Sequence, residues 1–322
     1  MVKIKMWQNP ERVEPAHKKE VPRRKLGPIK PVVERPSNYE EQNQHKGVKE
    51  IMDEINKLIG LESVKKLIKE LHAFIEIQRL REKEKLAHEP MVLHMIFKGN
   101  PGTGKTTVAR LLGQLFKEMG VLNKGHIIEV ERADLVGEYI GHTAKRTRDQ
   151  IKKALGGILF IDEAYSLARG GDKDFGKECI DCMVKSMEDN KDNLILILAG
   201  YQREMDDFIE SNPGLRSRFP IHITFPDYTI QQLMEIATLM LNEREYKLTP
   251  EAEEQMRVLL KERARLHRNS GNARLVRNLI ERSMRLQAVR LLNYKQSKLS
   301  REELMIITLE DIINAYDDLT EN

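Results

Sequence analysis

Cysteines, aromatic residues and long apolar runs are all scarce in this chain of 322 residues. Two cysteines cannot build a disulfide-stapled scaffold or a four-cysteine zinc site. No run of about 18 apolar residues occurs, so we expect no membrane-spanning helix. The first residues, MVKIKMWQNPERVEP, lack the apolar core of a secretory signal. These absences together predict a cytoplasmic protein.

The two cysteines, Cys179 and Cys182, lie in the short sequence CIDC. This spacing is compatible with a redox pair or with half of a metal site, but no second cluster of cysteine and histidine accompanies it. Two small apolar residues one turn apart on a helix, in a reducing compartment, are the simpler interpretation. We therefore expect two free thiols.

Charge is unevenly distributed along the chain. Residues 1–46 contain 11 basic and 6 acidic residues, which gives this segment a net charge of +5, whereas the whole chain has +4. The segment also contains six of the 12 prolines. This segment shows neither helical nor strand periodicity, so we expect an extended, disordered tail. Such a tail could contact nucleic acid, a membrane surface or an acidic partner, or could bind nothing specific. The remaining residues have a net charge of −1.

Between residues 47 and 226 the pattern is that of an α/β domain. A helical region at 49–86, interrupted at Gly60, comes first. Strands are then expected at 92–99, 126–132, 157–164, 193–200 and 221–225, and helices at 105–119, 143–154 and 175–188. The strands are runs of Ile, Leu and Val without alternation, which indicates a parallel sheet covered on both faces.

After Pro226 the pattern becomes helical throughout. Helices are expected at 229–245, 250–267, 272–293 and 308–319, which predicts an all-helical domain at 227–322.

The sequence GNPGTGKT, at residues 99–106, joins the first strand to a helix and fits the phosphate-loop pattern. Its glycines allow the backbone amides to turn inward around phosphate oxygens, next to the positive end of the following helix. Lys105 is expected to reach the β- and γ-phosphates of ATP, and Thr106 to bind Mg²⁺. The predicted phosphate-binding residues are Gly99, Asn100, Pro101, Gly102, Thr103, Gly104, Lys105, Thr106 and Thr107.

A second part of the site is expected in ILFIDE, at residues 158–163. The strand brings Asp162 to the sheet edge at which ligands bind in open α/β folds, where it can hold Mg²⁺. Glu163 can orient and deprotonate a water molecule, which favours hydrolysis over transfer to another acceptor. Glu163 could instead be a second Mg²⁺ ligand or a surface acid. One strand, at 126–132, lies between the two motifs, so we expect the sheet order 5-1-4-3-2.

With these motifs, residues 47–322 resemble the AAA+ ATPases: a phosphate-loop α/β domain followed by a helical lid. In LIGLESVKK the resemblance places Ile59 and Gly60 against the adenine. In PGLRSRF, at 213–219, it implies an arginine finger that completes the neighbouring subunit's site, with Arg218 as first choice and Arg216 as second. In SGNAR it makes Arg274 the second sensor of the γ-phosphate. Surface arginines without these roles are the alternative.

Two further roles of the family are assigned by the same resemblance. The first sensor usually ends the fourth strand as a Thr-Asn pair, whereas this chain has LAGYQRE, so either Tyr201 or Gln202 would take that role. DLVGEYIGHT, at 134–143, resembles the first central-pore loop, with Tyr139 gripping a substrate chain and Ile140 beside it. The alternative is a tyrosine packed in an ordinary loop.

The phrases EYIGHT, LAGYQREMDDFIESNPGLRSRF and ITFPDYT narrow the resemblance to the CbbX/CfxQ clade of red-type rubisco activases, and within it to the branch from spore-forming bacteria. This implies a homohexameric ring that uses ATP and Mg²⁺ to remodel a protein substrate, in spore formation. A nucleic-acid motor or loader is the alternative supported by the basic tail. The −1 folded part and 5% aromatic content favour the protein substrate. A third reading, a nucleotide switch without hydrolysis, leaves Glu163 and Arg218 without a purpose.

Overall fold

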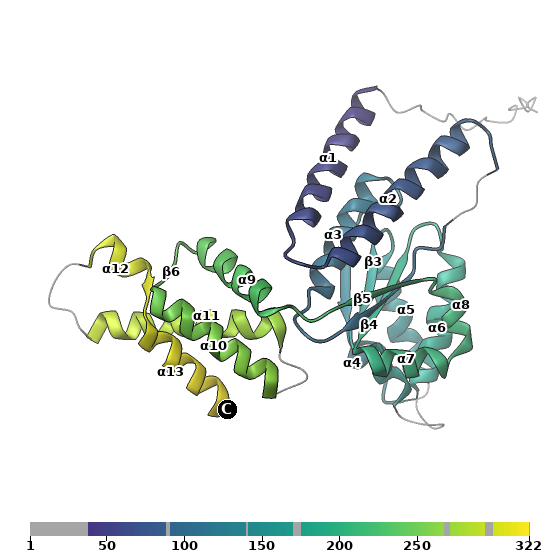
Figure 1. Cartoon of the computed structure of the whole chain (residues 1–322). Coiled ribbons are helices and arrows are strands. Elements are labelled where there is room, and N and C mark those ends of the chain that lie inside the picture. Colours follow the sequence, from purple (N-terminus) through teal and green to yellow (C-terminus); the bar gives the residue numbers. More distant parts are fainter. Residues whose placement is uncertain are drawn as a thin grey trace, which may run out of the picture.

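The computed structural model describes residues 38–87, 91–139, 141–169, 175–266, 271–293 and 299–321. An α/β body and a lid lie side by side and are joined by a single crossing of the chain after β5 (Figure 1). The tail predicted at 1–46 lies outside the described residues up to residue 37.

The body contains a five-stranded sheet in which every pair of neighbours is parallel. Its strands are β1 (Met95–Gly99), β2 (Ile127–Val130), β3 (Ile158–Ile161), β4 (Ile195–Gly200) and β5 (Ile221–Phe225). The order is β2-β3-β4-β1-β5, which is the predicted order read from the other edge. All strand ends that carry the predicted motifs therefore meet at one edge of the sheet.

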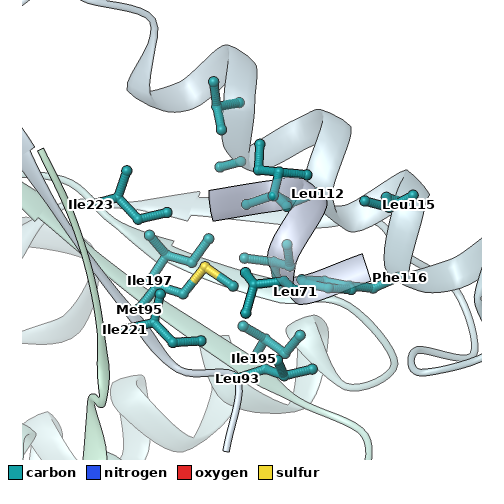
Figure 2. Packing of buried hydrophobic residues seen from close by; sticks show 14 of the residues in the cluster. Leu71, Leu93, Met95, Leu112, Leu115, Phe116, Ile195, Ile197, Ile221 and Ile223 are labelled. Atoms are coloured by element: carbon teal, nitrogen blue, oxygen red, sulfur yellow. The ribbon is translucent and has the colours of Figure 1, made fainter. Parts of the chain in front are cut away.

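Successive residues of each central strand point to opposite faces, and both faces are covered. Met95 and Phe97 belong to one buried cluster, whereas Ile96 belongs to the other. Figure 2 shows the first cluster, in which Leu112 and Phe116 of α3 (Lys105–Glu118) pack over the strands. On the other face lie α5 (His142–Ala154) and α6 (Gly176–Asp189).

Two long helices precede the sheet, α1 (Asn38–Lys57) and α2 (Glu62–Lys83). α1 begins before the boundary expected at residue 47, because residues 37–57 contain no proline and the glutamates and glutamines at 40–44 favour a helix. Gly60 adopts a φ of +62° in the turn between the two helices, where the interruption was expected.

Four short helices at the carboxyl edge of the sheet were not predicted, since segments of four to nine residues show too little periodicity. They are α4 (Arg132–Leu135), the 3₁₀ helix η1 (Ala164–Ala168), α7 (Gln202–Glu210) and α8 (Pro213–Arg218). Each follows a strand or another of these helices, so they form the rim around the predicted site.

The lid contains α9 (Ile230–Asn242), α10 (Pro250–Leu266), α11 (Asn272–Asn293), α12 (Arg301–Met305) and α13 (Leu309–Glu321). The expectation of an all-helical lid was wrong in one detail. β6 (Lys247–Leu248) and β7 (Ile306–Ile307) form a short parallel ladder. Strands of two residues are too short to alternate, so no sequence pattern marks them.

Buried polar residues join the lid helices. The Asp311 carboxylate, 2% exposed, accepts hydrogen bonds from Arg290 Nη2 at 2.8 Å and from the Thr308 backbone amide at 2.9 Å. Burial alone would raise the pKa of Asp311, but these hydrogen bonds lower it overall. Gln287 Nε2 donates to the carbonyls of Glu303, Leu304 and Ile306 at 3.0–3.3 Å.

Both cysteines lie on α6 as free thiols. Cys179 is buried in the core, and this burial raises the pKa of its thiol to about 12. Within the described ranges no helix has the length and apolarity needed to cross a membrane, and no cluster of acidic, histidine and cysteine side chains could hold a metal ion.

Candidate nucleotide-binding site

The phosphate loop follows β1 and ends where α3 begins at Lys105. Gly102 and Gly104 have φ values of +74° and +95°, which only glycine adopts readily. Space is also limiting, because a Cβ atom on Gly99 would lie 2.4 Å from the Phe225 carbonyl oxygen. Thr103 is buried, and its hydroxyl donates to the Asn100 carbonyl at 2.8 Å. The loop is therefore compact, with its shape fixed by internal contacts.

The Lys105 side chain reaches back into this loop. Its ammonium donates to the carbonyl oxygens of Gly99 and Asn100 at 2.8 and 2.9 Å. Burial lowers the pKa of Lys105, the negative charge of Asp162 opposes that shift, and the positive charge of Arg274 adds to it. The strand-end aspartate and the lid arginine thus both act on the loop lysine.

A cavity of about 480 Å³ opens beside the loop, between the body and the lid. Ile59, Leu61 and Leu239 give it an apolar part, whereas Lys105 and Arg274 supply positive charge and Thr106 and Thr107 supply hydroxyls. An apolar wall for a base and a cationic, amide-rich end for phosphates fit a nucleoside triphosphate. Gly60, at the turn beside Ile59, leaves room for Gln232 of the lid, whose Nε2 would lie 2.7 Å from a Cβ atom there.

Asp162 and Glu163 follow β3 directly. The Asp162 amide donates to the Val130 carbonyl at 3.0 Å, and the Glu163 amide donates to Asp162 Oδ1 at 3.0 Å. Glu163 has a left-handed backbone with φ of +45°, an uncommon conformation for a residue with a side chain. A hydroxyl from Thr106 and a carboxylate from Asp162 are ligands that Mg²⁺ accepts.

Glu163 faces a second cavity of about 420 Å³, which the loop residues Gly137 and Glu138 also line. Arg132 of α4 connects the two walls of this cavity, since its Nη1 donates to the Ser166 carbonyl at 2.7 Å. The predicted general base and the base of the predicted substrate loop therefore belong to one connected region.

The predicted first-sensor residues take different positions. Tyr201 caps α7, and its ring lies 6.1 Å from that of Tyr165. Burial and then the charge of Glu163 raise the pKa of Tyr165 to about 12, so Tyr165 adjoins the predicted general base. Gln202 is exposed on the first turn of α7. The sequence reading missed Tyr165, although it lies two residues after Glu163.

The predicted arginine-finger segment forms α8. Arg218 makes an ion pair with Glu188 of α6, and its Nη1 donates to the Gly214 carbonyl at 3.1 Å. It lines a cavity of about 410 Å³ together with Met91 and Val92, which shares no residue with the nucleotide cavity. Arg216 is exposed on the same helix. Neither arginine is brought to the phosphate loop of its own chain.

The predicted pore loop presents Tyr139 to solvent. This side chain is 66% exposed, and its ring lies 5.4 Å from that of His142. Behind it, the Gly137 amide donates to Thr143 Oγ1 at 3.0 Å, which anchors the base of the loop to α5. Ile140 lies outside the described residues. Tyr139 is thus exposed and contacts His142 of the same segment, and its role as a pore-loop residue stays a prediction.

Three further residues of the site were not predicted from the sequence: Asp227, Tyr228 and Asn272. Asn100 of the loop donates to both Asp227 oxygens at 3.0 Å, and Tyr228 donates to the Thr103 carbonyl at 3.3 Å. They belong to the phrases ITFPDYT and SGNAR, which indicated the family but not these contacts. Contacts between residues more than 100 positions apart leave no local pattern in one sequence.

Comparison with known proteins identifies the class. Residues 95–227 match the ATPase family associated with various cellular activities (AAA), and residues 229–322 match the AAA lid domain. The fold also resembles Thermotoga maritima RuvB, a Holliday junction branch migration motor, at 20% identity, with a TM-score of 0.54 over 83% of this chain and 72% of that one. The FIGL-1 AAA domain in complex with ADP gives a TM-score of 0.55 at 19% identity, over 80% and 82% of the chains. At such identities the likeness concerns the fold alone.

Among curated proteins, the chain is 58% identical to stage V sporulation protein K of Bacillus subtilis, with 84% of each chain covered. It is 47% identical to protein CbbX of Cereibacter sphaeroides, over 83% of this chain and 86% of that one. The chain belongs to the AAA ATPase family. Within that family it groups with the CbbX and CfxQ proteins, so the predicted resemblance and the predicted ATPase activity are confirmed.

Proposed function

We propose that this ATPase acts as a homohexameric ring that remodels a protein substrate. The observation that carries the proposal is the position of Arg218, on a cavity that shares no residue with the nucleotide cavity of its own chain. An arginine finger so placed can reach a γ-phosphate only in a neighbouring copy. A head-to-tail arrangement of that kind, repeated until it closes, gives a ring.

The predicted phosphate-binding, magnesium-binding and catalytic residues have separate roles in the proposed cycle. The loop amides from Asn100 to Thr106 and the Lys105 ammonium bind the phosphates, and Arg274 approaches the γ-phosphate from the lid. Thr106 and Asp162 would hold Mg²⁺, which supplies positive charge to the phosphate oxygens. Glu163 accepts a proton from the attacking water.

The neighbouring and rim residues complete the proposed site. Arg218 of the adjacent copy stabilises the charge that develops on the γ-phosphate, with Arg216 as the alternative. Tyr201 takes the first-sensor role in preference to Gln202, since Tyr201 adjoins the Tyr165–Glu163 pair.

A protein is the substrate that the exposed loop favours. Tyr139 exposes an aromatic ring to solvent. The cavity behind the loop extends to Glu163, so a movement of the loop can change the surroundings of the proposed general base. A relative from Cyanidioschyzon merolae, 43% identical over 86% of this chain and 95% of its own, is named ribulose bisphosphate carboxylase/oxygenase activase, and its target is thus a protein. The name of the Bacillus subtilis relative supports a role in spore formation.

Mixing two inactive variants tests the ring. Glu163→Gln and Arg218→Ala subunits should each hydrolyse ATP poorly, whereas a mixture contains interfaces that pair an intact Glu163 with an intact Arg218. We expect phosphate release to rise in the mixture. A matched control mixes Glu163→Gln with the double variant, which offers no intact interface. The proposal fails if the first mixture is no more active than its components.

Light scattering on Glu163→Gln with ATP provides the second test, with an expected mass near six subunits. A monomer at high protein concentration would support a nucleotide switch instead. Stimulation of hydrolysis by DNA, lost as salt rises, would support the nucleic-acid motor. Tyr139→Ala should keep basal hydrolysis and lose remodelling.

A further inference from the structure

Asn272, at the start of α11, is a buried polar residue at the junction of the body and the lid. Its side chain is 1% exposed and uses both ends of the amide. Nδ2 donates to Asp227 Oδ1 at 2.8 Å and to the Pro101 carbonyl at 3.3 Å, while Oδ1 accepts from the Tyr228 amide at 3.0 Å. One side chain thus joins the lid, the connection between the two parts and the phosphate loop.

The phosphate loop is bound to the same junction along four consecutive residues. Besides the Pro101 carbonyl, Asn100 donates to Asp227 at 3.0 Å, and the Gly102 carbonyl accepts from the Ala273 amide at 3.2 Å. The Thr103 carbonyl accepts from Tyr228 at 3.3 Å. We refer to Asn272, Asp227 and Tyr228, with their bonds to loop residues 100–103, as the clasp.

The backbone is shaped for this contact on both sides. Asn272 has φ of +46°, in the left-handed region that asparagine tolerates better than other residues with side chains. A Cβ atom on Gly102 would lie 2.3 Å from the Gly271 carbonyl oxygen and 2.8 Å from the Arg274 amide nitrogen. The loop and the first turn of α11 are therefore in backbone contact, which leaves the lid little freedom to shift at this point.

Arg274 follows Asn272 by two residues and lies on that first turn of α11. Its charge already acts on Lys105, so its guanidinium is near the phosphate end of the cavity. The Arg274 side chain is long and flexible, so it can detect whether a γ-phosphate is present only if its backbone is held in place. Among the described residues, this turn is held to the loop by the clasp, by the bond from the Ala273 amide to the Gly102 carbonyl and by the close backbone packing at Gly102.

We propose that Asn272 is a positioning residue, which fixes Arg274 relative to the phosphate loop and thereby allows the lid to distinguish ATP from ADP. This inference rests on the proposed role of Arg274. The carbonyls of Pro101 and Gly102 accept hydrogen bonds from the lid, so these bonds do not use the loop amides that the proposed site needs for the phosphates. Occupation of the γ-phosphate site is then reported to the whole lid through the turn that carries Asn272 and Arg274.

The test measures the ratio of ATP to ADP affinity by calorimetry, in the Glu163→Gln background so that ATP persists. Asn272→Gly keeps the left-handed backbone and removes only the side-chain bonds. We expect the ratio of ATP affinity to ADP affinity to fall about tenfold or more. The reason is that Asn272 loses its hydrogen bond to the Asp227 carboxylate, and hydrogen bonds to charged groups are the stronger ones. The ADP affinity should stay nearly unchanged. Arg274→Ala should have the same effect, and the double variant should lose no more than either single variant.

Gln287→Ala is the matched control. Gln287 is also a buried amide of α11, 3% exposed, but its three bonds stay within the lid. It should lower lid stability without changing the ATP-to-ADP ratio. If Asn272→Gly fails to fold, Asp227→Ala removes the acceptor from an exposed position and should lower the same ratio.

An unchanged ratio in both Asn272→Gly and Asp227→Ala, alongside a reduced ratio in Arg274→Ala, would overturn the inference and leave the proposed function standing. Additive losses in the double variant would also overturn it, since Asn272 would then act independently of Arg274. A Lys105→Ala protein that binds ATP normally would remove the nucleotide site itself, and with it the proposed function.

Discussion

The body and the lid are stabilised in different ways. In the body, the strands that form the centre of the sheet contribute almost only apolar side chains, such as Ile96 and Phe97, to two buried clusters. The lid also has an apolar core, but its helices are joined by a buried carboxylate on Asp311 and by the buried amide of Gln287. The body thus derives its order from continuous apolar strands, whereas the lid derives part of its geometry from a few directional bonds.

This difference matters for function because the two parts have different tasks. Chemistry requires Asp162 and Glu163 to be held rigidly at a sheet edge, and a close-packed sheet does so. In the proposed cycle the lid keeps one shape while its orientation changes, and directional bonds specify one arrangement of helices more strictly than apolar contact does. Substitutions at Asp162 and Glu163 should therefore mainly affect rate, and those at polar bonds internal to the lid should mainly affect stability.

The largest expected effect lies in the body. Glu163→Gln removes the proposed proton acceptor, and hydrolysis should slow by about 10²–10⁴-fold. ATP affinity and the melting temperature should stay close to those of the parent, because the phosphate loop and the core are untouched. Steady-state phosphate release and calorimetric ATP binding measure the two quantities. A variant that keeps a tenth of the rate or more would show that another group accepts the proton.

The largest effect in the lid is expected at Asp311. Asp311→Ala leaves the mostly buried Arg290 without its carboxylate, which should destabilise the lid by about 3 kcal/mol. Denaturant unfolding followed by hydrogen exchange at α11 and α13 would locate the loss. Destabilisation of the sheet instead of the lid would contradict the statement that this buried carboxylate stabilises the lid.

The same carboxylate predicts a pH dependence. Its pKa in the folded lid is below the ordinary 3.8, so its contribution to stability is complete above that value. The contribution should be lost as the pH falls through the lowered pKa. In Asp311→Ala the acid-dependent part of the lid's unfolding free energy should shrink accordingly. Equal acid sensitivity of variant and parent would assign that dependence to other groups.

A smaller effect is expected at Gln287. Gln287→Ala leaves the carbonyls of Glu303, Leu304 and Ile306 without their donor, at a cost of about 1–3 kcal/mol. The free energy of unfolding should fall while the rate of ATP hydrolysis at saturating ATP stays within about twofold. A large loss of rate at unchanged stability would contradict the division of tasks between the two parts.

The smallest effect is expected for the pair Arg282–Asp318, which joins α11 and α13 like the buried pair but is partly exposed. Asp318→Ala should change the unfolding free energy by no more than about 1 kcal/mol, since solvent screens such pairs. Thermal melts of this variant beside Asp311→Ala compare two ion pairs between the same two helices. Equal losses would show that burial does not decide their contributions.

The predictions from the sequence were also more complete for the body than for the lid. The five strands and their order were predicted correctly, because apolar runs, the phosphate loop and the intervening strand are local patterns. In the lid, the ladder of β6 and β7 was missed, since two residues carry no periodicity. The bonds of Asn272 were missed because they depend on residues 45 and 171 positions away. The ion pair of Arg218 with Glu188 likewise depends on how two helices meet.

The backbone contact between Gly102 and the first turn of α11 has a mechanical consequence. Because the two backbones touch here, a sliding movement of the lid along the body would break this contact, whereas a rotation about it would not. α12 lies at the end of the lid farthest from the body, so a rotation about this contact would move α12 the most (Figure 1). A small movement at the phosphate loop that turns the lid would therefore displace α12 by a larger distance, because α12 lies farther from the contact.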